Sequence, residues 1–256
     1  MKLSSIVIAK NEESNIRRCI ESQQNCIDEI IVLVDNDTTD NTFEISKSYK
    51  NVKAHLVKWQ GYSSTKNISI SMTSNNWILW IDADEEITPE LSEELKTFKN
   101  TNPDYLAYSI PRKAYFLGKW IKHSGWYPGR VTRLFNKSNG KFNANAVHEQ
   151  LEFAGKTGKL SGNLNHYTDP SIHHYFEKYN HYTSLAAGEL SNKGKKFSLS
   201  DIILRPLSIF IKMYLLKAGF LDGIQGFILA AFSSSYVFTK YCKLWELEKN
   251  KNQYLS

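Results

Sequence analysis

The sequence contains little cysteine, with three residues of this type in 256. Cys19, Cys26 and Cys242 are too few and too scattered for a disulfide framework or a zinc site. Long apolar runs are also scarce. Residues 223–239 form an uncharged run of 17, but this run contains three serines and falls short of the roughly 20 apolar residues that a spanning helix needs. Cross-links, a zinc centre and a membrane span are therefore not favoured.

A secretory signal is not evident either. The stretch "MKLSSIVIAKNEE" has a short apolar core that meets Lys10 and two acids at once, and no small-residue cleavage site follows it. The loop "GYSSTKN" at residues 61–67 is not a Walker A sequence, and no G-x-G-x-x-G surrounds it. We therefore expect a cytoplasmic protein that uses neither of these glycine-rich phosphate loops.

Charge is unevenly distributed, although the formal net charge is +6. Residues 1–128 contain 15 Lys and Arg against 17 Asp and Glu, whereas residues 129–256 contain 17 against 9. A basic half suits phosphate-rich ligands, nucleic acid or an anionic membrane surface, and charge alone does not decide among them. Because no nucleic-acid-binding motif accompanies it, we do not expect a nucleic-acid partner.

Short apolar runs alternate with helix-like segments over the first hundred residues. The runs are "LSSIVIA", "DEIIVLV", "VKAHLVKW" and "WILWI", and "ESNIRRCIESQQNC" between the first two has apolar residues at positions 16, 19 and 20, as on one face of a helix. This alternation predicts a mostly parallel α/β sheet with flanking helices. We expect this domain over residues 1–170 and a helical region over residues 171–256.

Polar tails follow three of the predicted strands, "KNE" at residues 10–12, "DND" at 35–37 and "DAD" at 82–84. The carboxyl ends of parallel strands meet at one edge of a sheet, which is where ligands bind in such folds. Carboxylates two residues apart on an extended segment point the same way. Asp82 and Asp84 therefore suit a hard divalent cation such as Mg²⁺.

The alternative for the acids after "WILWI" is the start of a helix. The following "TPELSEELKTF" has Thr88 as a candidate N-cap and Pro89 at a position that fits the first helical residue. For Glu85 and Glu86 two roles are possible: a contact with the acceptor, or negative charge at the N-terminus of this helix.

Four basic or acidic side chains each have a functional and a structural interpretation. Asp35 could accept hydrogen bonds from a ribose or a base, or it could be a turn residue in "DNDTTDNT". Lys66 could meet a phosphate or a base carbonyl, or it could lie in solvent. Arg130 and Arg133 each have a planar guanidinium that could bind a diphosphate through two hydrogen bonds. Alternatively, they could belong to a basic strand on a solvated face.

Two more candidates lie further along the chain. Glu149, next to His148 in "NANAVHEQLEF", is a candidate general base, although a surface glutamate is the commoner case. His166 in "NLNHYTDP" is either a metal or phosphate ligand or a core histidine satisfied by hydrogen bonds. Neither residue defines a function by itself.

Taken in order, six stretches resemble an inverting glycosyltransferase of family 2 with the nucleotide-sugar-binding GT-A fold: "SIVIAKNEESNIRRCIES", "EIIVLVDNDTTDNT", "GYSSTKN", "WILWIDADEEIT", "RVTRLF" and "VHEQL". The resemblance extends over essentially the whole chain. Its "DADE", R-x-x-R-L-F, "VHE" and following histidine are similar to the subgroup that adds β-glucose to the lipopolysaccharide core. It implies a nucleotide diphosphate sugar as donor, with uridine as the base, and a cell-envelope glycan or lipid-linked acceptor.

On the donor side, the resemblance implies a nucleotide pocket that includes Ala9, Asn11, Glu12, Asp35 and Lys66. Asp82 would contact the ribose or the metal. Asp84 would bind the Mg²⁺ or Mn²⁺ that bridges the diphosphate, and His166 could complete that metal or diphosphate site.

For the reaction itself, the resemblance places the general base at Glu149. Arg130 or Arg133 would help to neutralise the charge that develops on the diphosphate. A single displacement inverts the anomeric carbon, so we expect no nucleophilic residue. The alternative is a sugar-nucleotide-binding partner protein that has lost catalysis, and the joint presence of Asp84, Arg133 and Glu149 argues against it.

The sequence departs from the family at two points. It lacks the Gln-x-x-Arg-Trp motif of many processive relatives, so polysaccharide synthesis is not expected, and "DNDTTD" replaces the usual Asp-Ser-Gly-Ser tail. Near the C-terminus, "ILRPLSIFIKMYLLKAGF" mixes Arg205, Lys212 and Lys217 with large apolar residues. Such a segment suits a helix in the interface on the inner face of the cytoplasmic membrane, or an oligomer contact. The simpler alternative is a helix packed on the catalytic domain.

Overall fold

The computed structural model describes residues 1–143 and 151–253. The chain divides into two compact units. The first comprises Met1–Lys113 and Gly129–His166, and the second comprises Ala114–Pro128 and Tyr167–Ser256. The sequence predicted a single boundary near residue 170. In the structure the second unit also includes the internal segment 114–128.

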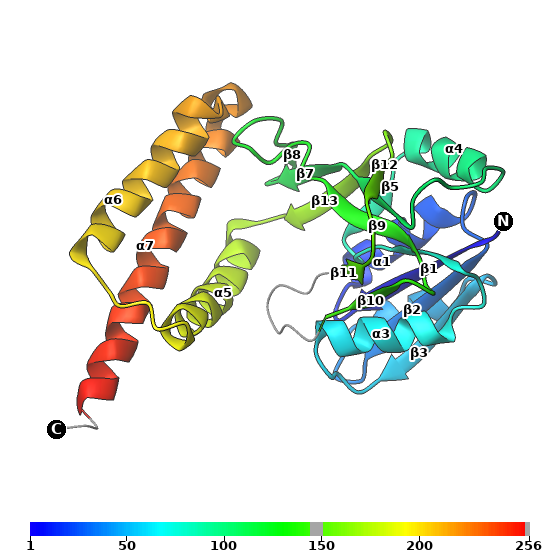
Figure 1. The fold of residues 1–256 in the computed structure, drawn as a ribbon, viewed down its shortest axis with the longest axis horizontal. Helices are drawn as coiled ribbons and strands as arrows, with labels where there is room; N and C mark the ends of the chain where they lie inside the picture. The colour runs from blue at the N-terminus through cyan, green and yellow to red at the C-terminus, as the bar shows by residue number, and fades with distance from the viewer. Residues whose placement is uncertain (144–150, 254–256) are drawn as a thin grey trace. The chain divides into compact units, whose positions relative to one another are not determined.

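A seven-stranded sheet forms the centre of the first unit (Figure 1), in the order β12-β6-β9-β4-β1-β2-β3. Its strands β4, β1, β2 and β3 are parallel, as the sequence predicts, whereas β9 runs antiparallel between β4 and β6. The bounds are β1 Leu3–Ala9, β2 Glu29–Asp35, β3 Val52–Val57, β4 Trp77–Trp80, β6 Ala107–Ile110, β9 Val131–Asn136 and β12 Thr157–Lys159.

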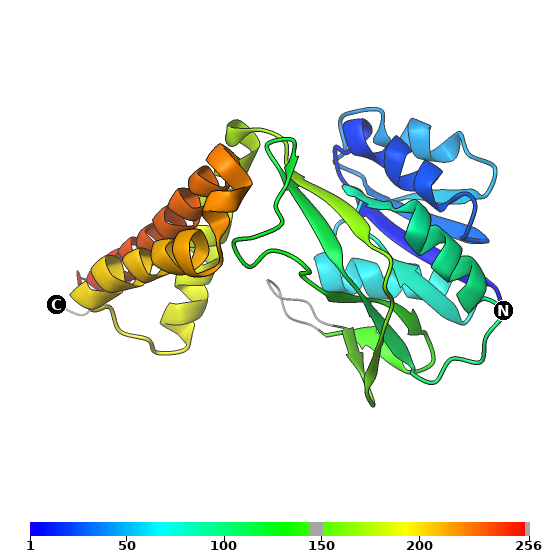
Figure 2. The same ribbon diagram turned by 90° about the horizontal axis from the view of Figure 1, so that it is seen from above.

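Helices cover both faces of this sheet (Figure 2), because its central strands are apolar on both sides. The helices are α1 Glu13–Gln23, α2 Thr42–Lys47, α3 Tyr62–Met72 and α4 Pro89–Phe98. Ile16 and Ile20 of α1 pack with Val7 and Val32 on one face, and Ile68 of α3 packs on the other. The alternation of side chains along each strand therefore supplies two hydrophobic cores.

The predicted start of α4 is confirmed. Thr88 is the N-cap, its side chain accepts a hydrogen bond from the backbone of Leu91, and Pro89 is the first helical residue. Two short pairings complete the first unit. Strand β10 Gly140–Phe142 pairs with β11 Leu151–Phe153, and β5 Glu85–Ile87 pairs with the first three residues, 164–166, of β13 Leu164–Asp169.

The second unit is mainly helical, as expected for the C-terminal region. Helices α5 Ile172–Asn192 and α6 Leu199–Phe210 pack along α7 Gly223–Gln253 (Figure 1), and a π-helical segment, η1 Ile211–Leu216, and a 3-10 segment, η2 Gly219–Asp222, connect α6 to α7. The β7 Arg112–Phe116 and β8 Lys119–Trp120 hairpin lies before them in the chain. The backbones of Lys122 and His123 both donate hydrogen bonds to the buried carboxylate of Asp222.

None of the described helices is by itself long and apolar enough to cross a membrane. The bent pair formed by residues 199–216 and 219–250, which meet at 70°, would qualify by length and composition.

Candidate active site

The loops that follow β1 and β2 contact each other at the carboxyl edge of the sheet. Lys10 Nζ lies 2.8 Å from the buried carboxylate of Asp35, and Asn11 Oδ1 accepts a hydrogen bond of 2.8 Å from the backbone of Thr39. The hydrogen bond from Lys10 lowers the pKa of Asp35. Ala9 is the buried last residue of β1. The expected convergence of these strand ends is confirmed, while a ribose or base contact of Asp35 stays a prediction.

Glu12 begins the turn into α1. Its backbone donates a hydrogen bond of 2.8 Å to Thr42 Oγ1, and its carboxylate accepts one of 2.8 Å from Asn15 Nδ2. These hydrogen bonds hold Glu12 in place at the start of α1. The expected contacts of Asn11 and Glu12 with a nucleotide stay predictions.

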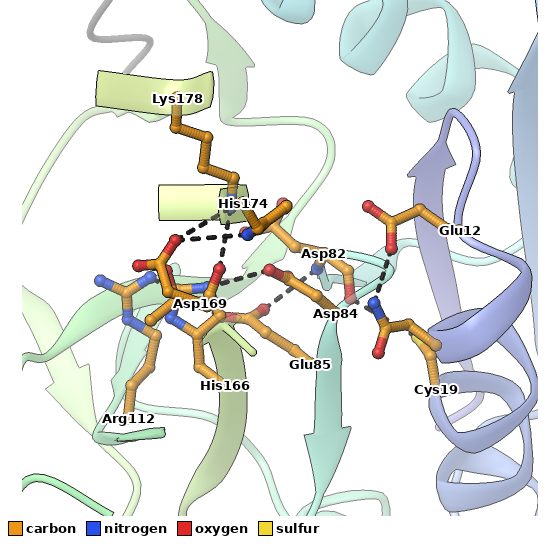
Figure 3. A network of polar contacts seen from close by, with 12 residues as sticks. Glu12, Cys19, Asp82, Asp84, Glu85, Arg112, His166, Asp169, His174 and Lys178 are labelled. Carbon is orange, nitrogen blue, oxygen red and sulfur yellow. Dashed lines mark hydrogen bonds and ion pairs between the residues drawn. The ribbon is translucent and has the colours of Figure 1, made fainter. Parts of the chain in front are cut away.

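The acids after β4 form a folded cluster rather than a solvated helix start (Figure 3). The backbone of Asp82 donates to Glu85 Oε2 at 3.0 Å, and the backbone of Glu85 donates back to Asp82 O at 2.9 Å. The side chain of Glu85 has no exposed surface. Glu86 instead accepts a hydrogen bond of 3.0 Å from Asn165. Glu85 therefore anchors the cluster, a role that no feature of its local sequence indicates.

Arg133 neutralises this cluster from within the core. Its Nη2 donates to Asp82 Oδ2 and to Glu85 Oε1, both at 2.6 Å, and Arg112 Nη1 lies 3.7 Å from the same Glu85 oxygen. Arg133 is fully buried, so the solvated basic strand considered for it is wrong. Its Nε and Nη1 have no hydrogen-bond partner in the described part of the chain. The expected contact of Arg133 with a diphosphate stays a prediction.

Two cationic side chains lie over the indole ring of Trp80, the last residue of β4. The Arg133 guanidinium lies 3.4 Å and Lys66 Nζ 3.9 Å from the ring centroid, distances at which the ring quadrupole attracts a cation. Trp80 Nε1 donates to the Thr132 carbonyl at 2.8 Å, which fixes the ring. Lys66 is buried, so its interpretation as a solvated surface lysine is also wrong.

These cations keep Asp82 ionised. Burial would raise the pKa of its carboxyl group, but the charges of Arg133, Lys66 and His166 outweigh burial and hold that pKa well below its usual range. The side chain is nevertheless 40% exposed. Asp82 is therefore a persistent carboxylate that can accept hydrogen bonds from a ligand.

Asp84 and His166, 82 positions apart in the sequence, face each other (Figure 3). His166 Nε2 lies 3.3 Å from Asp84 Oδ2, and each side chain is 18% exposed. The pairing of β13 with β5, in which His166 is opposite Glu85, positions the imidazole. Burial lowers the pKa of His166, but the hydrogen bond and charge of Asp84 outweigh that effect and raise it overall.

This pair fits a divalent cation that also takes oxygens from its ligand. A single carboxylate leaves coordination positions for phosphate oxygens and water, which is how Mg²⁺ usually binds beside nucleotides, whereas an imidazole is more often a ligand of transition-metal ions. Within residues 1–143 and 151–253, no group of three or more His, Cys, Asp or Glu side chains is arranged to hold a metal ion. A cation at Asp84 and His166 would have coordination positions open to water or to a bound phosphate.

Arg130 lies in a different setting from Arg133. Its Nη1 donates to the carbonyls of Ser109 and Leu160, at 3.1 and 2.9 Å. Its diphosphate contact stays a prediction. The candidate base Glu149 and its neighbour His148 lie outside the described residues.

Comparisons with known proteins show the family of the chain. The model of the family described as "Glycosyl transferase family 2" matches residues 4–159. An uncharacterized glycosyltransferase of Rickettsia typhi is 35% identical over 264 residues, which cover 98% of this chain and 89% of that protein. The lipopolysaccharide core biosynthesis glycosyltransferase LpsC of Rhizobium meliloti is 27% identical, with 96% of this chain and 93% of that protein covered.

The α/β sheet and the match to the family model together define a glycosyltransferase. The chain belongs to glycosyltransferase family 2. Among solved structures, S. aureus TarS 1-349 in complex with UDP-GlcNAc aligns over 99% of this chain and 92% of that one, with a TM-score of 0.47 and 14% identity.

Proposed function

We propose that the protein is a metal-dependent, inverting glycosyltransferase that transfers a sugar from a nucleotide diphosphate sugar to a hydroxyl of a cell-envelope glycan or lipid-linked acceptor. The observation that carries the proposal is the Asp84–His166 pair at the carboxylate edge of a family 2 chain. The similarity to LpsC supports a lipopolysaccharide-core type of acceptor. Uridine is the first base to test, because the sequence resembles enzymes that use it.

The departing nucleotide diphosphate gains negative charge as the glycosidic bond breaks. Asp84 and His166 would hold Mg²⁺ or Mn²⁺, which supplies positive charge beside that leaving group. Asp82, kept ionised by Arg133 and Lys66, would accept hydrogen bonds from the ribose. Because Arg133 and Glu85 hold Asp82 in place before the donor arrives, little reorganisation is needed during the reaction.

The acceptor hydroxyl must lose a proton as it attacks. We assign that proton to Glu149, on the basis of its position in "VHEQL". A single displacement on the face opposite the leaving group inverts the anomeric carbon, and no covalent enzyme intermediate is required.

The test is a comparison of Asp84→Asn with Asp104→Asn, a matched change at an exposed aspartate. A thermal-shift screen of nucleotide diphosphate sugars with Mn²⁺ first selects the donor, and turnover is then measured with and without the metal. Asp84→Asn should lose about 100-fold or more of the metal-stimulated turnover. Asp104→Asn should behave like the parent protein.

Glu149→Gln in the same assay should still give the donor-induced thermal shift but should lose transfer. Metal-stimulated turnover that is unchanged in Asp84→Asn would remove the metal site from this pair. Turnover retained in Glu149→Gln would move the base elsewhere.

A further inference from the structure

Segment 199–227 of the second unit exposes an unusual amount of apolar surface. Eleven of the twenty-two large apolar side chains that are exposed in the described residues lie within it. The most exposed are Leu216 at 76%, Leu199 and Ile224 at 64% and Leu204 at 62%. We refer to the exposed apolar side chains of residues 199–227 as the apolar face. Large apolar side chains that are exposed in such numbers within one segment often mark an interaction site.

The apolar face follows from helical periodicity. Along α6 and η1, exposed apolar residues occur at positions 199, 203, 207, 211 and 215, at intervals of four, with Leu204 and Leu216 beside them. The other side of the same helix packs inward: Pro206 is buried, and Ile202 packs with residues of α7. The helix is therefore apolar on both its inner and outer sides, and packing within the unit uses only the inner one.

The charges around the apolar face are of one sign. Within residues 199–227 the exposed charged side chains are Arg205, Lys212 and Lys217, whereas the acids Asp201 and Asp222 are buried. Asp201 is paired with Arg205 at 2.5 Å, and Asp222 with His123 at 3.0 Å. An anionic surface that approaches this face therefore meets basic groups and no exposed carboxylate.

The backbone favours docking in the plane of a bilayer over crossing it. The two arms of the segment meet at 70°, and Ala218 at the bend has a left-handed conformation with φ of 53°. A crossing helix would also have to carry Lys212 and Lys217 into the hydrocarbon, which is costly. In the plane of the interface, the same lysines reach the headgroups while the leucines enter the acyl boundary.

We propose that the apolar face docks in the plane of a phospholipid bilayer with anionic headgroups. Leu204, Leu216 and Ile224 would enter the boundary of the acyl chains, and Lys212 and Lys217 would contact headgroup phosphates. This docking does not depend on catalysis, and it goes beyond the proposed reaction by identifying the surface on which the enzyme works. A lipid-linked acceptor would be met on that surface.

The test uses the full-length protein in a flotation assay with phosphatidylglycerol-containing vesicles and with pure phosphatidylcholine vesicles. Leu204→Glu/Leu216→Glu should weaken binding to the anionic vesicles by about tenfold or more. Leu56→Glu is the matched control, because Leu56 is 53% exposed in the first unit, and it should bind normally. Lys212→Gln/Lys217→Gln should lose about fivefold per lysine, and added salt should weaken binding of the parent protein.

Asp84→Asn should bind vesicles like the parent protein, which separates failure of the docking from failure of the proposed reaction. Absence of vesicle binding, or equal binding to neutral and anionic vesicles, would overturn the proposal. So would a dimer in light scattering that Leu204→Glu/Leu216→Glu converts to a monomer without any vesicle binding, because the face would then belong to a second copy of this chain.

Discussion

The carboxylate edge of the first unit and the apolar face of the second depart from the usual distribution of residues in opposite directions. The first unit buries charges: Lys66, Glu85 and Arg133 are almost wholly inside the protein. The second unit exposes leucines while it buries three aspartates, Asp169, Asp201 and Asp222. Buried charges are costly unless they are paired, and exposed apolar groups do little for the folded state. The two regions should therefore respond very differently to substitution.

The largest expected effect is that of Arg133→Met. This change leaves Asp82 and Glu85 without their principal counter-charge, so unfolding free energy should fall by about 3–5 kcal/mol. Urea denaturation followed by tryptophan fluorescence gives the value. Arg130→Met is the control, since it removes hydrogen bonds to two carbonyls only, and should cost about 1 kcal/mol. Equal losses in the two variants would show that the buried pairing does not hold the site.

A smaller effect with a definite pH dependence is expected at Glu29, a buried carboxylate at the start of β2. Burial opposes its ionisation, but hydrogen bonds from Lys53, Ser4 and Ser74 lower its pKa from 4.5 to about 2. A depressed pKa in the folded state stabilises the protein above pH 4.5, and that contribution is lost as the pH falls towards 2. Glu29→Gln should therefore destabilise the protein by about 2 kcal/mol at pH 7.

The difference between Glu29→Gln and the parent protein should shrink below pH 4.5, as measured by denaturation at several pH values. The exposed Glu44→Gln in α2 provides the control, with a change within about 0.5 kcal/mol at every pH. A loss for Glu29→Gln that stays constant from pH 7 to pH 3 would assign its effect to packing rather than to charge.

These cases show what the sequence could predict. Apolar strands and their polar tails are local patterns, so the parallel strands β1 to β4 and the gathering of Asp35 and Asp82 at one edge followed from them. The burial of Arg133 did not, because it depends on β9 lying antiparallel to β4 and on Glu85, 48 positions away. Its local sequence suggested either a diphosphate contact or a solvated strand, and only the tertiary structure revealed the buried pairing.

The contact between Asp84 and His166 could not be predicted from the spacing of residues in the sequence, because it too depends on the tertiary structure. The pairing of β5 with β13 brings the two side chains together, and nothing in either local sequence specifies that pairing. The residues alone left His166 open between ligand and core histidine, and the family resemblance supplied the connection with the metal. The structure shows that the two side chains lie 3.3 Å apart, and the role of His166 at a metal stays a prediction.

The smallest loss of stability is expected for a substitution in the apolar face, and it gives the clearest comparison with the buried core. Leu216→Ser removes a leucine that is 76% exposed, so unfolding free energy should change by no more than about 0.5 kcal/mol. Leu229→Ala, at a fully buried leucine of α7 in the same unit, should cost about 2–5 kcal/mol. Thermal or urea denaturation of both variants measures the difference. If Leu216→Ser were as damaging as Leu229→Ala, the apolar face would be part of the fold itself; a negligible loss leaves an external partner as the reason for its leucines.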